Sequence, residues 1–303
     1  MIKLYKEVNM RKIKDFIICF INGLCMSLAD SVPGVSGGTV AFILGFYDKF
    51  IVSLDELFRG NFKSKINSAK YLIKIGIGWV FGFLLAISFL SSLFDNHIYE
   101  LSSIFIGFII FAIPVVIKEE KYALVGKYKN IIFALLGGLL VFLITYLNRV
   151  VGSGFNIDSF NIGTILYVFF AASLAISAMI LPGISGSTLL LIFGIYIPIV
   201  TKVKEIISFN FSSFPIVVVF GFGMIFGIVF FTKFLRTCLA KRRSATIYTI
   251  IGMMIVSIYS IIMGPTTLEY NYLTFKTFNI WFFLLGGVII FSLEGLKNVL
   301  IKK

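Results

Sequence analysis

Charged residues are scarce in this sequence. Only 14% of its 303 residues are Asp, Glu, Lys or Arg, whereas a soluble domain of this size carries about 25%. This scarcity excludes an ordinary soluble domain, and a hydrophobic content of 59% with a mean hydropathy of +1.02 agrees. Runs such as 71–94 and 278–296 are long enough to cross a bilayer, which takes about 20 residues. The sequence therefore predicts an all-α polytopic membrane protein.

Cysteine and histidine are also rare. The spacing of Cys19, Cys25 and Cys238 fits no metal motif, and an odd number of thiols makes no disulfide framework. We expect these thiols to be small buried hydrophobes and the single histidine, His97, to be solvated in a short external loop. The sequence thus predicts no metal site and no cofactor.

Acidic residues are few beside basic ones, 14 against 27, which gives a net charge of +13. In a soluble protein this excess would suggest a nucleic-acid partner, but in a membrane protein it indicates cytoplasmic loops that follow the positive-inside rule. No nucleic-acid partner is expected. The N-terminal basic residues precede an apolar run without a small-residue cleavage site, so we expect this segment to be retained.

Proline is rare too, with six residues, and two of them open a repeated motif. The two copies are Pro33-Gly34-Val35-Ser36-Gly37-Gly38-Thr39 and Pro182-Gly183-Ile184-Ser185-Gly186-Ser187-Thr188. Each copy interrupts a long apolar run, where a broken helix leaves costly unpaired backbone groups unless it is buried in protein or lines a polar cavity. Two such breaks in corresponding positions are typical of a transporter's binding site.

The motifs belong to two related halves of the chain, 1–150 and 151–303, joined by the polar stretch 148–161. Identical residues recur at an offset of 149 positions around the motifs and near the end of each half. In the region between these two parts the offset is 145 positions. The pairs include Ala29/Ala178, Gly45/Gly194, Tyr47/Tyr196, Gly78/Gly223, Gly107/Gly252 and Gly137/Gly286.

Each half is predicted to hold one hairpin followed by three membrane crossings. The hairpins span 13–50 and 162–200, and the crossings span 71–94, 98–117, 130–147, 214–235, 246–263 and 280–297. With both termini in the cytoplasm, this topology places 23 of the 27 Lys and Arg residues inside. Because each half crosses an odd number of times, the second half is inverted relative to the first. The hairpin arms are long enough for full crossings, but we expect re-entrant helices that meet near the midplane.

The motif residues suit an anion. Pro33 disfavours helix at the residue before it, and Ser36 or Thr39 can cap the helix that follows. A new helix N-terminus offers unpaired N–H groups and a positive dipole end, for which phosphate is the usual ligand. The competing interpretation is a turn whose hydroxyls bond its own backbone. The predicted phosphate-binding residues are Ser36, Gly37, Gly38, Thr39, Ser185, Gly186, Ser187 and Thr188, and the helix-breaking residues are Pro33, Gly34, Pro182 and Gly183.

Asp30 is the acid next to the first motif, and Met179 replaces it in the second half. An acid at membrane depth is a functional candidate, here for coupling to protons or sodium. The competing interpretation is a carboxylate paired with a backbone N–H or a nearby Lys.

The first motif and its flank, Ala29-Asp30-Ser31-Val32-Pro33-Gly34-Val35-Ser36-Gly37-Gly38-Thr39, together with Leu181–Thr188, resemble the bacterial polyprenyl-phosphate transporter family, formerly described only as a membrane domain of unknown function. The resemblance extends to about residue 297. It implies a translocase of the bacterial cytoplasmic membrane that returns undecaprenyl phosphate from the outer to the inner leaflet for reuse in envelope glycan synthesis. The polyprenyl tail is implied by the resemblance alone, as is the transfer of substrate contacts to Asp30 and residues 36–39, paired with the second loop.

Two other functions stay open. A membrane-embedded polyprenyl-diphosphate phosphatase also carries a Pro-Gly-x-Ser motif, but that motif continues with an Arg where this chain has Gly37 and Gly186. The chain offers hydroxyls without a credible base or acid partner, so the hydrolase ranks below transport and no catalytic residue is expected. An inorganic-anion channel or exchanger would also use Gly-Ser helix termini.

Overall fold

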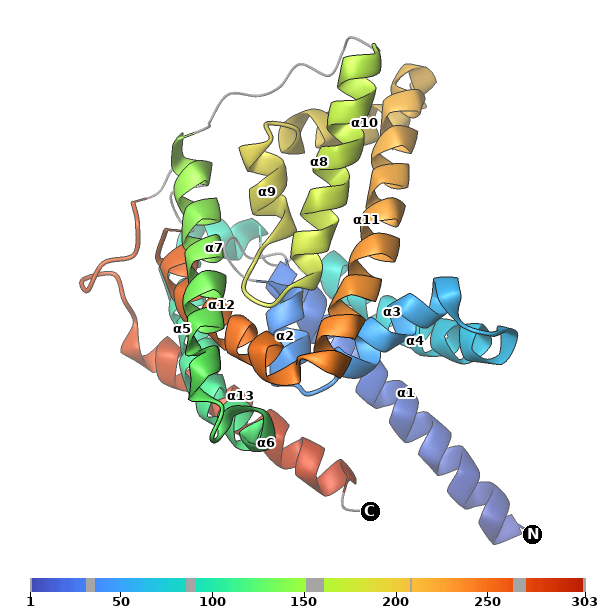
Figure 1. The fold of residues 1–303 in the computed structure, drawn as a ribbon, viewed down its shortest axis with the longest axis vertical. Coiled ribbons are helices and arrows are strands. Elements are labelled where there is room, and N and C mark those ends of the chain that lie inside the picture. Colours follow the sequence, from blue (N-terminus) through green and yellow to red (C-terminus); the bar gives the residue numbers. More distant parts are fainter. Residues whose placement is uncertain are drawn as a thin grey trace.

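The computed structural model describes residues 2–30, 36–85, 91–150, 161–207, 209–263 and 271–301; most of these residues lie in helices, and no strand occurs among them. Six of the described helices are long and apolar enough to cross a membrane. The predicted all-α polytopic fold is therefore confirmed, and the protein is a multi-pass membrane protein (Figure 1).

The two halves contain similar series of helices. The first half comprises α1 (Ile2–Asp30), α2 (Gly37–Ile43), α3 (Tyr47–Arg59), α4 (Phe62–Leu85), α5 (Ser91–Glu119), the short α6 (Lys121–Leu124) and α7 (Ile131–Val150). The second comprises α8 (Ile162–Ile180), α9 (Gly186–Ile192), α10 (Tyr196–Ile207), α11 (Phe214–Lys241), α12 (Arg243–Met263) and α13 (Ile280–Ile301), with a 3₁₀ turn at Phe211–Ser213 before α11.

Most of the predicted crossings coincide with single helices, but the limits predicted for the first crossing were wrong. Instead of spanning 71–94, α4 begins at Phe62 and is described as far as Leu85, and Ser91–Phe94 belong to α5. The helix starts before the apolar run because the lysines there are good helix formers. The apolar run therefore marks the part that lipid can cover, and the helix itself is longer.

Each hairpin has a long arm and a broken arm. Helices α2 and α3 are bent by 120° relative to each other. In Figure 1, α1 reaches the centre of the molecule from the lower end and α3 lies to the right of α2. Helix α8 reaches the centre from the upper end, and α9 and α10 lie back towards that end.

The long arm of each hairpin packs closely against the first long helix that follows. Helix α1 pairs with α4, and α8 pairs with α11. A Cβ on Gly78 would lie 2.0 Å from the carbonyl oxygen of Phe20, and a Cβ on Gly223 would lie 2.4 Å from that of Phe169. Both contacts need glycine, and they join equivalent positions of the repeat.

The remaining long helices pair across the two halves. Helix α5 packs on α13, and α7 packs on α12. A Cβ on Gly107 would lie 2.2 Å from the carbonyl oxygen of Phe283, and one on Gly252 would lie 1.9 Å from that of Ala134. These contacts also join equivalent positions, so the two halves exchange one helix each.

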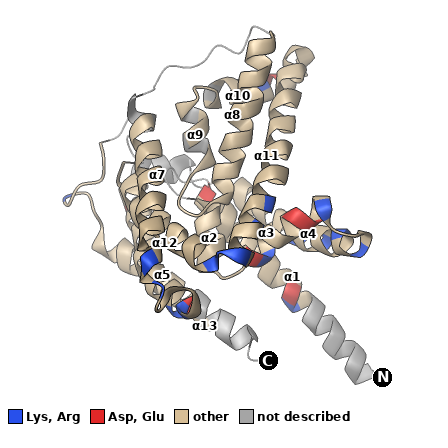
Figure 2. Cartoon of the chain, viewed as in Figure 1, with Lys and Arg blue, Asp and Glu red and all other residues tan. Residues whose placement is uncertain are grey.

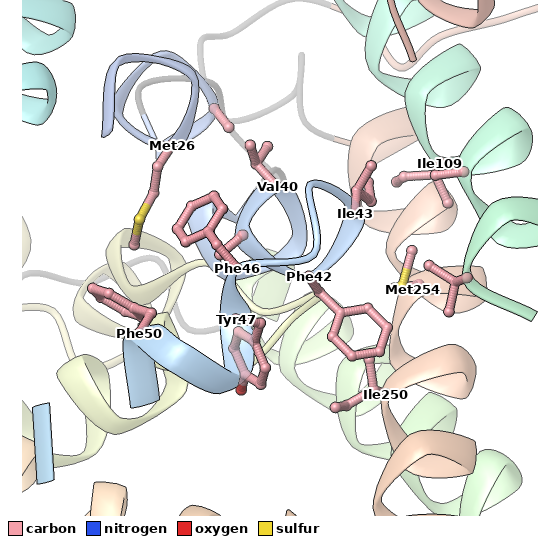
Figure 3. Close-up of a cluster of buried hydrophobic side chains, with 14 of the residues drawn as sticks. Met26, Val40, Phe42, Ile43, Phe46, Tyr47, Phe50, Ile109, Ile250 and Met254 are labelled. Carbon is pink, nitrogen blue, oxygen red and sulfur yellow. The ribbon is translucent and has the colours of Figure 1, made fainter. Parts of the chain in front are cut away.

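Helix α2 lies at the centre of the largest apolar cluster. All seven of its residues are buried. Side chains from several helices surround it, as Figure 3 shows. They include Met26 of α1, Phe50 of α3, Ile109 of α5, and Ile250 and Met254 of α12. Many large apolar side chains of α4, α7, α8 and α11 are instead exposed, as expected for helices that face lipid.

Charged side chains gather at one end of the molecule. Figure 2 shows Lys and Arg along α3 and α4 and near the lower ends of α5 and α12, whereas few lie around α8, α9 and α10. Among them, Arg236 and Arg243 form ion pairs with Asp55 and Asp48 of α3.

Two glycines of α4 provide a test of this packing. We expect Gly78→Ala to destabilise the fold by about 1–3 kcal/mol, because its Cβ would overlap the backbone of α1. Gly76→Ala, two residues earlier, has nothing within 4 Å of its Cβ and should be neutral or stabilising by up to about 1 kcal/mol. Thermal unfolding in detergent compares the two, and equal melting temperatures would contradict the α1–α4 contact.

Candidate substrate-binding site at the junction of the two motifs

The two motif loops meet at the centre of the molecule. The Ser36 hydroxyl donates to the carbonyl of Leu181 at 3.1 Å, and the Gly183 N–H donates to Oγ1 of Thr39 at 2.7 Å. In Figure 1 the loop between α8 and α9 accordingly lies beside α2. We call these four residues the motif junction. The structure thus brings together residues that are more than 140 positions apart in the sequence.

Ser36 forms the N-cap of α2. Ser36 and Thr39 were the two residues that the sequence offered for this role. Its backbone is extended, with φ −125° and ψ 131°, and its Oγ accepts from the N–H of Gly38 at 3.2 Å. One hydroxyl therefore accepts from its own helix and donates to the other half of the chain. An extended N-cap with a hydroxyl acceptor is the usual way to begin a helix.

Gly183 turns the second loop towards Thr39. Its φ of +88° lies in the left-handed region, which favours glycine. A Cβ there would also lie 2.8 Å from the Met253 backbone of α12. The neighbouring Pro182 is fully buried. The predicted helix break is thus present in the second half, whereas Pro33 and Gly34 lie outside the described residues.

Tyr47 adds a third bond between the halves, and sequence reasoning missed it. Its hydroxyl donates to the carbonyl of Ile180 at 3.1 Å, and the residue is buried. A Cβ on Gly38 would lie 2.8 Å from the same carbonyl oxygen. The identical pair Tyr47/Tyr196 next to the motifs was the available signal. Gly38 therefore allows the two backbones to approach each other.

Asp30 is bound to the first motif. Its carboxylate accepts from the N–H of Gly37 at 2.7 Å and from the indole N–H of Trp79 at 3.2 Å. A Cβ on Gly37 would lie 2.5 Å from this carboxylate. The backbone pairing that the sequence left as an alternative is therefore present. The first amide of α2 holds an anion, and that anion belongs to the protein; sequence reasoning had no signal for Trp79.

The second motif lacks this carboxylate. Gly186 begins α9, and a Cβ on it would lie 2.9 Å from the Cβ of Met179. Met179 stands where the first half has Asp30, and a thioether is at most a weak hydrogen-bond acceptor. Ser185 is buried beside this start of α9. Ser187 and Thr188 lie within α9, but their side chains are outside the described residues.

No group of three or more His, Cys, Asp or Glu side chains among the described residues could hold a metal ion.

Comparison with known proteins identifies the family. Residues 26–293 match the family described as VCA0040-like, undecaprenyl phosphate translocase-like. The chain belongs to this family. It is similar to two proteins named polyprenyl-phosphate transporter. The protein from Staphylococcus aureus is 32% identical over 272 residues, 88% of this chain and 93% of the relative. The protein from Vibrio cholerae is 28% identical over 273 residues, 86% of this chain and 82% of the relative. No solved structure matches.

The Thr39–Gly183 bond can be tested by an isosteric change. Thr39→Val removes the acceptor and leaves a buried N–H unpaired, which we expect to cost about 1–3 kcal/mol of folding stability. Thr39→Ser keeps the hydroxyl and should retain most of that stability. Thermal unfolding of both variants measures the difference, and a Thr39→Val protein as stable as Thr39→Ser would show that the bond contributes nothing.

Proposed function

We propose that this protein moves a polyprenyl phosphate, undecaprenyl phosphate in particular, from the outer to the inner leaflet of the cytoplasmic membrane. This transfer would return the lipid carrier for reuse in envelope synthesis. The observation that carries the proposal is that both motifs meet through hydrogen bonds at the buried centre of the chain. The chain also belongs to a translocase-like family. The names of its relatives support the same substrate.

The transport mechanism proposed here is alternating access by two inverted repeats, 1–150 and 151–303, with both termini in the cytoplasm. Equivalent glycine contacts in the two halves and their exchange of one helix each support the repeat. The gathering of Lys and Arg at one end supports the orientation. The hairpins that point towards the centre from opposite ends support two re-entrant arms.

The phosphate headgroup is proposed to bind at the motif junction, against the amides and hydroxyls of residues 36–39 and 185–188, while the isoprenoid tail stays in lipid. These groups would take the place of the water that a phosphate loses when it enters hydrocarbon. The bond from Gly37 to Asp30 supports an anion at this place, because the protein already puts one there.

The same bond suggests how a cation is coupled to transport. A phosphate that takes the Gly37 amide must displace the Asp30 carboxylate, and two adjacent anions repel each other. A proton or sodium ion on Asp30 would remove that repulsion. Such coupling would also help against an inside-negative potential, which costs about 2.3 kcal/mol per charge per 100 mV for inward movement of an anion.

A reconstituted assay tests the function directly. Purified protein in liposomes that hold undecaprenyl phosphate in the outer leaflet should accelerate its appearance in the inner leaflet, with proton and sodium gradients applied separately. Release of phosphate from a polyprenyl diphosphate would favour the phosphatase. Passage of chloride or inorganic phosphate without lipid transfer would favour an anion channel or exchanger. Either result would overturn the proposal.

Asp30→Asn tests the coupling. We expect slower transfer and a weaker dependence on pH or sodium, because the amide side chain binds neither ion as a carboxylate does. Its oxygen can still accept from Gly37, so the fold should be kept. A variant that retained the wild-type dependence would remove Asp30 from the coupling mechanism.

Gly37→Leu tests the headgroup site. Its side chain would overlap the Asp30 carboxylate and Met26 and cover the Gly37 amide, so we expect binding of a lipid phosphate to fall at least about tenfold. Titration of the folded variant with a short-chain polyprenyl phosphate measures this. Normal affinity would place the headgroup elsewhere.

A further inference from the structure

The turns within the two hairpins are built alike. Gly45, between α2 and α3, has φ +72°, and Gly194, between α9 and α10, has φ +66°. The same backbone bonds close both turns: Phe46 N to Ala41 O at 3.1 Å and Ile195 N to Leu190 O at 3.0 Å. The halves therefore begin their second arms in the same way.

Both second arms are also fixed alike to the helix that follows. The hydroxyl of Ser68 in α4 donates to Glu56 of α3 at 2.9 Å. At the equivalent positions, the hydroxyl of Ser213 donates to Glu205 of α10. A contact that is present in both halves does not distinguish the two sides of the molecule.

The burial of the two arms differs sharply. Tyr47 of α3 is 1% exposed, but its counterpart Tyr196 of α10 is 38% exposed. One turn further on, Ile51 is 0% exposed and its counterpart Val200 is 38% exposed. Residues four apart lie on one face of a helix. The same face is therefore covered in α3 and uncovered in α10.

Helix α11 of the other half packs against α3. An ion pair joins them, with Nη1 of Arg236 2.7 Å from Oδ2 of Asp55. The Asp55 side chain is only 7% exposed and also binds Arg59, one turn further along α3, at 2.7 Å. A charge this well buried requires its partners, because loss of one leaves it poorly compensated.

A second ion-pair cluster holds the start of the same arm. Arg243, at the beginning of α12, binds Asp48 of α3 at 2.7 Å and Glu120, after α5, at 2.5 Å. The first hairpin is thus fastened at two points to helices outside it.

The equivalent positions of the other half do not carry these charges. At the repeat offsets, Lys204 stands for Asp55 and Ser91 for Arg236, while Ile197 stands for Asp48 and Ile98 for Arg243. No pair of opposite charges can form from these residues. These two ion pairs therefore have no counterpart at the equivalent positions on the α10 side.

We propose that α3 and α11 form a gate on the cytoplasmic side, that Asp55–Arg236 is its latch, and that the structure has this gate closed while the α10 side is open. The assignment of sides rests on the topology proposed above. In the opposite state α3 leaves α11 and the latch breaks, while α10 closes and buries Tyr196 and Val200. The closed latch keeps the junction facing the outer leaflet until the substrate binds.

Distances between α3 and α11 test the gate without any lipid. Spin labels at the exposed positions Phe58 and Thr237, in a chain whose three cysteines are replaced by Ala, should show a short and a long separation. Arg236→Gln should raise the population ratio of the long to the short separation by about threefold or more. The lost ion pair forms only in the closed state, so its removal favours the open one.

Arg59→Gln is the matched control. It also removes one arginine from Asp55, but both residues lie on α3, so the ratio should stay near that of the parent chain. Arg236→Lys keeps the charge and should lie between. Equal shifts for the two Gln variants, or no shift for Arg236→Gln, would overturn the latch.

A cross-link tests whether the gate must open during transport. Cysteines at the exposed positions 58 and 237, beside the latch residues, joined by a reducible bifunctional linker, should stop lipid transfer, and a reductant should restore it. A link between positions 205 and 213 should leave transfer unchanged. Unimpaired transfer with the first link would exclude the gate. Absence of transfer in every protein, unlinked ones included, would instead count against the proposed function, while the spin-label distances would still decide the latch.

Discussion

Hydrogen bonds between the two motif loops are the contacts on which the rest of this structure depends. A helix that breaks in the apolar interior must place its freed N–H and C=O groups on some partner. Here side chains of the first motif bond backbone groups freed in the second, Ser36 to the carbonyl of Leu181 and Thr39 to the N–H of Gly183. Without the first motif, the carbonyl of Leu181 and the N–H of Gly183 would lose these partners. The two hairpins therefore stabilise each other, and the helices around them are arranged to hold both in place.

This bonding between the loops also constrains the substrate. A phosphate that uses the same amides and hydroxyls must replace bonds within the protein. Binding is then linked to a rearrangement of the junction, and through it to the arms on either side. The Asp30 carboxylate on the Gly37 amide makes this competition electrostatic. An asymmetry between the halves follows, because Met179 leaves the second loop without such an anion.

The sequence predicted the fold class and the helix break that the structure shows in the second motif. It could do so because apolar runs of bilayer length and a Pro-Gly break in hydrocarbon leave few structural choices. It failed at the limits of α4, where lysines continue the helix beyond the apolar run. It also missed Trp79 and Tyr47. The role of Trp79 depends on which helices become neighbours, and no spacing along one chain reports that. The repeat marked Tyr47 but not the carbonyl that it binds.

The most direct test of the account asks where the headgroup sits. A short polyprenyl phosphate with a diazirine beside its phosphate can be photolysed on the folded protein, and the labelled peptides can be identified by mass spectrometry. We expect adducts in both 36–39 and 181–188, which unlabelled undecaprenyl phosphate should suppress. Adducts confined to the outward faces of helices such as α7 and α11, with none at either loop, would contradict a shared headgroup site.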